Sequence, residues 1–364
     1  MKMHSRIHTL RAAFAILFLV AFTNALGQTN DAAIARNREA IRSIIAKESV
    51  PAISVSVVKN GTVVWTEAFG RANIEANSAA TPDTMFGIGS ISKSLTMVLA
   101  VKLAEEGLLD LDAPIEKYLP DFPHRNQGVT IRLIGQHLSG YADDFDNDNF
   151  YNTKRYESTD ESLKAFYPEK LAAKPGERTI YGTTTFTLVA GAIEKATKRD
   201  FVTAINDFVL KPLQLKNIVP NDKRRIIPNR TAFYIRDQIG NTVNGEYTDP
   251  SFKIAGAGYL STAEELAKFG SALTDAGFLK RKSLDELFQL SKTSGGQQTP
   301  FALGFRVVKA ADGKEMIHQP GGGVGISSVL YIDRQRKVSV AILTNQTGAP
   351  IGNLNFLRAI ADSF

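Results

Sequence analysis

The chain contains no cysteine among its 364 residues, and it contains only five histidines. The absence of cysteine excludes a disulfide framework, a thiol nucleophile and a lipidated cysteine. Only His124, His137 and His318 lie downstream of residue 27, and they are far apart in the sequence. Zinc sites commonly use His and carboxylate ligands at close spacing, which these histidines do not show. The sequence therefore predicts no metal site.

The chain also lacks a strong excess of charge of one sign. Lys and Arg together number 43, Asp and Glu number 37, and the formal net charge is +6. Lys2, Arg6 and Arg11 lie in an N-terminal segment without acidic residues, and the rest of the chain has 40 basic and 37 acidic residues. No run of like charges suggests a groove for nucleic acid. We therefore expect no nucleic-acid partner.

A hydrophobic run long enough to span a membrane is missing from the N-terminus. The apolar stretch Ala12–Leu26 has 15 residues and is interrupted by Thr23 and Asn24, whereas a spanning helix needs roughly 20. The basic residues before it and the small residues at Ala25-Leu26-Gly27 are typical of a cleavable secretory signal over residues 1–27. We therefore expect a periplasmic or secreted protein without a stable membrane anchor; an uncleaved anchor helix is the alternative.

The two ends of the chain are rich in β-forming residues. Ala52–Val58 and Thr62–Phe69 are joined by Asn60-Gly61, which is a strong signal for a β-hairpin. Near the other end we expect strands over Phe305–Lys309, Ser327–Ile332 and Val338–Leu343.

Helical patterns fill the middle of the chain and lie at both of its ends. Strands at the ends with helices between them predict an α+β fold with one antiparallel sheet, built from residues of about 30–80 and 300–364. A mostly helical subdomain, residues of about 81–299, is inserted into a single domain over residues 28–364, and a functional site is expected at the seam. The expected helices are 31–48, Ser92–Glu106, Thr185–Lys195, Phe201–Leu210, Thr262–Leu273 and Ile351–Ser363.

A Ser-x-x-Lys pattern, Ser90-Ile91-Ser92-Lys93, opens one of these helical stretches. Positions i and i+3 share a helix face, so the Lys93 amine can reach the Ser90 hydroxyl. A serine hydroxyl is a poor nucleophile until a base removes its proton, and a desolvated lysine can be that base. The pattern predicts a nucleophile–base pair; the alternative is a helix-capping Ser90 with Lys93 exposed to solvent.

A second copy of the pattern, Ser56 to Lys59, shows that the pattern alone is weak evidence. This copy falls in an expected strand, where positions i and i+3 point to opposite faces. We therefore expect only the copy at Ser90 to form a pair.

The Ser90 segment is one of several motifs that follow one another in order. They are Phe86–Lys93, Leu109–Pro114 with Tyr118-Leu119-Pro120, Gln136–Gly140, Lys211-Pro212-Leu213 and Gly258–Leu266. Together they make the chain resemble the serine β-lactamases, D-alanyl-D-alanine peptidases and related esterases of the class C type, from about Ile53 to about Thr344. The resemblance implies a β-lactamase/transpeptidase-like fold and a serine hydrolase that forms an acyl-enzyme without a cofactor.

The second motif of this family, Tyr-x-Asn after a Pro-Gly turn, is matched by Tyr181-Gly182-Thr183. The resemblance implies that Tyr181 shares proton transfer with Lys93; a core tyrosine at a helix start is the alternative. In relatives the asparagine binds the amide of the acyl side chain. Here Thr183 takes its place, and a hydroxyl cannot offer both the donor and the acceptor of an amide. We therefore expect Thr183 to border the substrate and to disfavour β-lactam hydrolysis.

The third family motif, Lys-Thr-Gly or His-x-Gly, fits here in two registers. One register uses His318-Gln319-Pro320, and the other uses Gln319-Pro320-Gly321. A shift of one residue turns a strand side chain to the other face. We take His318 as a substrate-binding candidate, with a structural histidine as the alternative. The backbone N–H of Gly321 or Gly322 would complete an oxyanion hole with the Ser90 N–H.

The resulting hypothesis is hydrolysis of esters, small amides or D-amino-acid peptides, with weak β-lactamase activity at most. His137 lies in a structural turn of the family, so we expect no catalytic role for it. The alternative function is a penicillin-recognising or cell-wall-binding protein with little turnover.

Overall fold

The structure is a computed structural model that describes residues 31–123, 125–142, 152–166, 171–310 and 312–364. The expected signal segment, residues 1–27, lies outside the described residues. Within those ranges, no helix has the length and apolar character that crossing a membrane requires.

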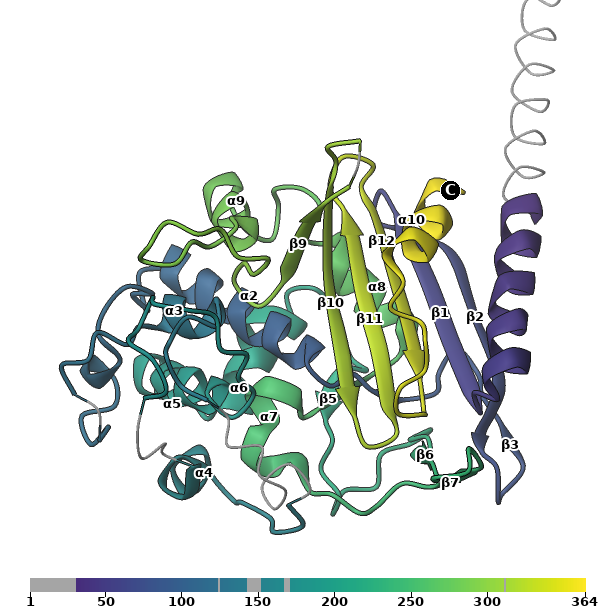
Figure 1. Cartoon of the computed structure of the whole chain (residues 1–364), viewed down its shortest axis with the longest axis horizontal. Helices are drawn as coiled ribbons and strands as arrows, with labels where there is room; N and C mark the ends of the chain where they lie inside the picture. The colour runs from purple at the N-terminus through teal and green to yellow at the C-terminus, as the bar shows by residue number, and fades with distance from the viewer. Residues whose placement is uncertain (1–30, 124, 143–151, 167–170, 311) are drawn as a thin grey trace, which may run out of the picture.

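The two ends of the chain build one seven-stranded antiparallel sheet with the order β3-β2-β1-β12-β11-β10-β9 (Figure 1). The ends meet where the first strand pairs with the last, and Ile53 lies opposite Thr344. The sheet confirms the expected architecture. Its strands are β1 (Ala52–Lys59), β2 (Thr62–Asn73), β3 (Ser78–Ala79), β9 (Arg306–Lys309), β10 (Glu315–Gly323), β11 (Ile326–Asp333) and β12 (Val338–Thr344).

The hairpin between β1 and β2 has the turn that its sequence predicts. Asn60 and Gly61 adopt φ values of 50° and 77°, and two positive φ values in a two-residue turn match the twist of the flanking strands. The third family motif implied a strand at β10, but no local pattern predicted it, because Pro320 and the glycines that follow it are poor strand formers. Its partner β9 pairs only as far as His318, so Pro320 lies where β10 has become a sheet edge, and proline is tolerated there.

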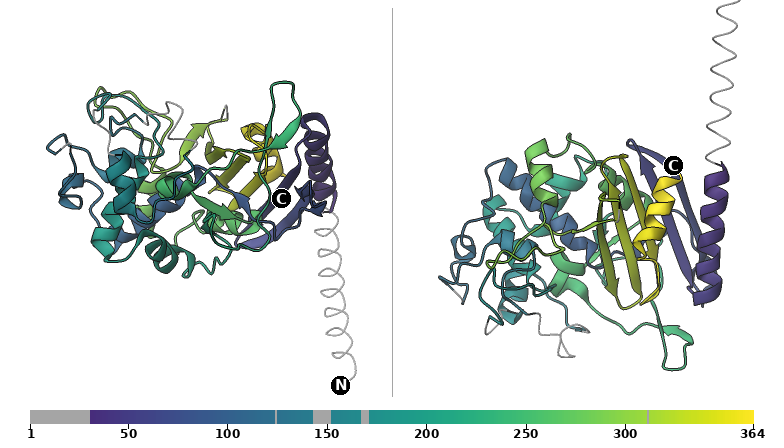
Figure 2. Two further views of the ribbon diagram at one scale, coloured as in Figure 1. Left: turned by 90° about the horizontal axis from the view of Figure 1, so that it is seen from below. Right: turned by 45° about the horizontal axis from the view of Figure 1, so that its top comes forward.

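Helices cover both faces of the sheet. The helix of residues 31–48 and α10 (Leu354–Asp362) lie together at the end of the molecule opposite the helical part (Figure 2). Side chains along β11 alternate between two apolar cores: Val329 packs in the core beneath these helices, and Leu330 packs in the core beneath α8 (Ala263–Ser271). The α+β fold with a sheet flanked by terminal helices is therefore confirmed.

The middle of the chain is mostly helical, as expected. The expected helix over Phe201–Leu210 divides into α6 and a π-helical turn, η2. Short strands join this part to the sheet as β4-β8-β5 and as the β6-β7 hairpin. The elements are α2 (Ile91–Glu105), η1 (Ile115–Lys117), α3 (Ile131–Gly135), α4 (Thr159–Phe166), α5 (Phe186–Thr197), α6 (Phe201–Ile205), η2 (Asn206–Leu210), η3 (Pro250–Lys253), α7 (Ile254–Ala257), α9 (Arg281–Phe288), β4 (Phe86–Gly87), β5 (Val219–Pro220), β6 (Tyr234–Arg236), β7 (Thr242–Asn244) and β8 (Tyr259–Ser261).

Candidate active site

Ser90 lies directly before α2, the central helix of the larger core. Residues on all sides of this helix are buried, because its sequence is apolar all round rather than along one stripe. Gly89 turns the chain into the helix with φ +48°, and a side chain there would lie 2.7 Å from the nitrogen of Gly322 on β10. Glycine at position 89 therefore lets the start of α2 press directly against the sheet edge.

The Lys93 amine lies at the centre of a cluster of oxygen atoms. Its Nζ is 2.9 Å from Ser90 Oγ, 3.0 Å from Thr183 Oγ1 and 3.1 Å from the Gly256 carbonyl oxygen. The lysine side chain is 0% exposed, and the Ser90 side chain makes no capping hydrogen bond to α2. The alternative of a capping serine beside a solvated lysine is therefore wrong.

The cluster is held together by close backbone packing between α7 and the segment that carries Thr183. A side chain at Gly256 would lie 2.3 Å from the Thr183 carbonyl oxygen. Glycine at this position therefore allows both segments to bring an oxygen to Lys93.

The other serines near these lysine patterns have different partners. Ser92 Oγ donates to the Gly89 carbonyl and accepts from the Tyr259 N–H. Ser56 Oγ donates to the Trp65 carbonyl, while Lys59 Nζ donates to a backbone oxygen of Phe364. The second Ser-x-x-Lys pattern therefore forms no pair, as its place in a strand predicts.

Tyr181 is half-buried and stands beside the lysine. The Lys93 Nζ lies 4.8 Å from the centre of the tyrosine ring, and the Arg306 guanidinium carbon lies 5.6 Å from it. On another side the His137 ring stacks on the tyrosine with 4.3 Å between ring centres. Tyr181 is therefore packed by several side chains next to the proposed nucleophile–base pair.

His137 supports the Tyr181 segment; the sequence analysis expected it in a structural turn but did not predict this contact. Its Nδ1 accepts a hydrogen bond from the Gly182 N–H at 3.2 Å. Burial, followed by the charges of Lys93 and Arg306, lowers the pKa of His137 well below its ordinary value. The imidazole is therefore neutral and carries its proton on Nε2. In the sequence, only the place of His137 in the Gln136–Gly140 motif indicated a structural role. Its positive φ of 58°, which sets the direction of the side chain, could not be predicted.

The third motif presents Gln319, rather than His318, to the nucleophile segment. Gln319 Nε2 donates to the Ser90 carbonyl at 3.4 Å, and a side chain at Gly321 would lie 2.1 Å from the Ile88 carbonyl. Neighbouring strand side chains alternate in direction, so His318 points to the opposite face from Gln319, and its register partners are Arg306 and Tyr331. The placement favours the register Gln319-Pro320-Gly321 and gives no support to a substrate contact by His318.

A cleft of about 850 Å³ opens beside these groups. It brings together Ser90, Tyr181, Thr183 and Gly322 of the expected site, whereas Gly321 packs beneath it against Ile88. The remaining lining residues are Ile235, Arg236, Glu246, Gly323, Val324 and Thr347.

Comparison with known proteins identifies the family. A family model described as Beta-lactamase matches residues 37–361. The chain belongs to the Beta-lactamase family. It is 27% identical over 393 residues to the Serine beta-lactamase-like protein LACTB, mitochondrial, of Homo sapiens, a match that covers 82% of this chain and 72% of that protein.

Solved structures agree with this Beta-lactamase-family assignment. The octameric penicillin-binding protein homologue from Pyrococcus abyssi matches with a TM-score of 0.75 and 27% identity, over 87% of this chain and 74% of that one. A D-stereospecific amidohydrolase from Streptomyces sp. matches with a TM-score of 0.74 and 23% identity, over 90% and 98% of the two chains, and shows the shared fold alone. The expected family and fold are confirmed.

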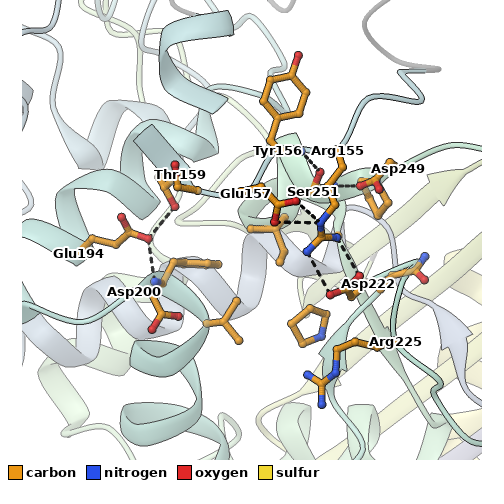
Figure 3. A pocket seen from close by; sticks show the side chains of 18 residues that line it. Arg155, Tyr156, Glu157, Thr159, Glu194, Asp200, Asp222, Arg225, Asp249 and Ser251 are labelled. Atoms are coloured by element: carbon orange, nitrogen blue, oxygen red, sulfur yellow. Dashed lines mark hydrogen bonds and ion pairs between the residues drawn. The ribbon is translucent and has the colours of Figure 1, made fainter. Parts of the chain in front are cut away.

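Another pocket, of about 240 Å³ and lined by many charged side chains, lies in the helical part of this protein (Figure 3). Its charged groups bond to one another: Arg155 pairs with Asp222 and with Glu157. Glu194 accepts hydrogen bonds from Thr159 Oγ1 and the Phe201 N–H, although burial raises its pKa. The charged groups of this pocket are therefore used in bonds within the protein. The Ser90 cleft is the better candidate for the active site.

Acid should destabilise the protein through its buried histidines. Burial, then the Arg306 charge, lowers the pKa of His318 from 6.5 to about 4. Between pH 6.5 and about pH 4, His318 is protonated in the unfolded chain but stays neutral in the folded protein. The free energy of unfolding therefore decreases as the pH falls through this range. We expect this group to contribute a loss of up to about 3 kcal/mol in the free energy of unfolding.

Chemical denaturation at neutral pH and near pH 4.5 measures this loss, with His318→Gln as the comparison. Carboxylates titrate in both proteins, so the difference between them isolates His318. A smaller loss in the variant is expected, and equal losses would contradict the assignment.

Proposed function

We propose that this protein is a serine hydrolase that forms an acyl-enzyme on Ser90. The main support for this proposal is the distance of 2.9 Å between Lys93 Nζ and Ser90 Oγ at the start of a buried helix. A hydroxyl within hydrogen-bond reach of a desolvated amine, beside an open cleft, is the arrangement that nucleophilic catalysis requires.

The amine can act as the general base in its neutral form. Its two N–H groups can donate hydrogen bonds to Thr183 Oγ1 and to the Gly256 carbonyl. The nitrogen lone pair can then accept the proton of the Ser90 hydroxyl. The freed Ser90 oxygen then attacks the substrate carbonyl carbon. Tyr181, beside Lys93, is proposed to pass the proton on to the leaving group.

The negative charge of the tetrahedral intermediate needs donors at the helix start. We assign the Ser90 N–H and the Gly322 N–H as the oxyanion hole, because Gly322 lines the cleft and its nitrogen lies against Gly89. Collapse of the intermediate releases an alcohol or amine, and water then cleaves the acyl-enzyme. The cycle needs no cofactor.

Carboxylic esters and small D-amino-acid amides or peptides are the proposed substrates. The structural similarity to the Streptomyces protein, a D-stereospecific amidohydrolase, supports this class. Thr183 in place of an amide argues for weak β-lactam hydrolysis at most. The signal-like N-terminus supports a periplasmic or secreted location.

A substrate panel tests this function. Steady-state turnover of a nitrophenyl ester, a D-amino-acid nitroanilide and a cephalosporin is compared with labelling by a fluorescent penicillin. We expect turnover of the ester or the anilide to exceed that of the cephalosporin. Stoichiometric labelling without any turnover would instead support the penicillin-recognising alternative.

Thr183→Asn should alter the choice of substrate. An asparagine can accept from Lys93 through its carbonyl and also donate to an amide on the substrate, since position 183 lines the cleft. Each such bond contributes roughly 0.5–1.5 kcal/mol. We expect the ratio of kcat/KM for an acylamido substrate over a simple ester to rise about two- to tenfold.

The measurement must be a ratio, because the substitution can also disturb Tyr181 and lower both rates together. An unchanged ratio would show that position 183 serves Lys93 alone and does not contact the acyl group.

A further inference from the structure

A second cavity, of about 310 Å³, adjoins the Ser90 cleft. The two share Glu246, Gly322, Gly323 and Val324 as lining residues. A substrate whose carbonyl lies at Ser90 and Gly322 can therefore extend past Val324 into this cavity.

Residues that flank the β6-β7 hairpin and residues of the turn between β10 and β11 line the cavity. Figure 1 shows this hairpin near the ends of the C-terminal strands. The packing there is tight: a side chain at Gly325 would lie 2.3 Å from Phe233 Cβ, and one at Gly245 would lie 2.8 Å from Val324 Cγ1. The base of the β6-β7 hairpin is therefore held close against the turn between β10 and β11.

Lys223 lines this cavity and lies near two aromatic rings. Its Nζ lies 4.6 Å from the centre of the Phe233 ring and 6.0 Å from that of Tyr247. Among the residues that the structure describes, its ammonium has no hydrogen bond and no ion pair. Burial, together with the Arg230 charge, lowers the pKa of Lys223, while Asp249 opposes the shift. A half-buried cation of this kind attracts an anion strongly, because the surrounding dielectric is low.

A second lysine adds to the positive character of the inner wall. Lys253 is 7% exposed and lines the same cavity. The two carboxylates of the lining, Glu75 and Glu246, are both exposed, and Glu75 already accepts a hydrogen bond from Asn244 at 2.7 Å. The cations therefore lie inside the cavity and the acids at its rim.

We propose that this cavity, which we call the lysine subsite (Lys223, Lys253, Phe233 and Tyr247), binds a carboxylate of the substrate. The inference rests on the proposed hydrolase function and specifies its substrates. They are esters or amides that carry a carboxylate several bonds away from the scissile carbonyl, in the acyl part or in the leaving group.

Matched esters test the lysine subsite. For the acyl part, the nitrophenyl hemiester of suberic acid is compared with nitrophenyl octanoate. For the leaving group, 4-carboxyphenyl butyrate is compared with phenyl butyrate. We expect the carboxylate ester of one pair to be preferred in kcat/KM, and Lys223→Met to reduce that preference about tenfold, since a charge-assisted contact is lost.

Two control variants separate charge from side effects. Lys223→Arg keeps the positive charge and should retain part of the preference. Lys216→Met removes an exposed lysine outside the subsite and should leave the preference unchanged. Circular dichroism shows whether each variant is folded, and Lys223→Gln replaces Lys223→Met if the latter is not.

Calorimetric binding of the same esters to Ser90→Ala distinguishes the two proposals. Hydrolysis of both pairs with ratios that Lys223→Met leaves unchanged would overturn the lysine subsite alone. A Lys223-dependent preference in binding, with no hydrolysis by the unaltered protein, would support the subsite and overturn the hydrolase function.

Discussion

Ser90→Ala should abolish hydrolysis, with a fall in kcat/KM of about 10⁴-fold or more, because the proposed acyl-enzyme can no longer form. The fold should be unaffected, because the Ser90 side chain makes no capping bond to α2 and its Oγ contacts Lys93 Nζ. The measurement is steady-state kinetics on the best substrate of the panel, together with the thermal midpoint of unfolding. We expect the midpoint to stay close to that of the unaltered protein.

Ser92→Ala is the matched control on the same turn. Ser92 is fully buried and bonds to the Gly89 carbonyl and the Tyr259 N–H. Its loss should cost about 1–3 kcal/mol of stability, because a buried N–H loses its partner, yet it should leave a reactive Ser90. Activity that survives Ser90→Ala and disappears in Ser92→Ala would show that the wrong serine has been assigned.

Lys93→Arg should be nearly as damaging as Lys93→Ala, with a loss of about 10³-fold in kcat/KM. A guanidinium keeps its proton in proteins, so it cannot accept the proton of Ser90. The kinetic measurement is paired with circular dichroism, because Lys93 is 0% exposed and a larger side chain strains the core.

Lys102→Arg provides the control on the same helix. Lys102 pairs with Glu105 and Glu106 at 3.4 Å near the surface, where either cation can serve, so activity should stay within about twofold. A folded Lys93→Arg protein with near-normal turnover would exclude lysine as the general base.

The sheet could be predicted from local patterns, except for the short strand β3 and for β10. Asn60-Gly61 between two β-rich runs is sufficient to predict the first hairpin, because the turn geometry is encoded in those two residues. β10 could not be predicted, because Pro320 and its glycines oppose a strand locally. Pairing with β11, from Ile317 opposite Ile332 onward, overrides that preference.

Contacts within the site could be derived from local geometry only where the residues are close in the sequence. Ser90 and Lys93 are one helical turn apart, so their contact follows from helix geometry. The partners of that pair come from distant segments: Gly256 supplies a carbonyl, and Gln319 reaches the Ser90 backbone. Such contacts depend on how α7 and β10 pack against α2, which no local pattern contains.

Thr183 and His137 illustrate the same limit. The sequence places Thr183 at the substrate, and the structure adds that its hydroxyl accepts from Lys93. His137 was expected to be structural; its ring stacks on Tyr181, next to the proposed site, and it is not among the residues that line the cleft. A side chain in a turn can therefore position a proposed catalytic residue, Tyr181, that lies far away in the sequence.

Trapping the acyl-enzyme is the most direct test of the central claim. The protein is mixed with a slowly turned-over ester, quenched in acid within the first turnover, digested and mapped by mass spectrometry. The account predicts one acyl group per chain, on the peptide that contains Ser90, and none in Ser90→Ala. Turnover without any adduct, or an acyl group on Ser92 or Tyr181, would contradict it.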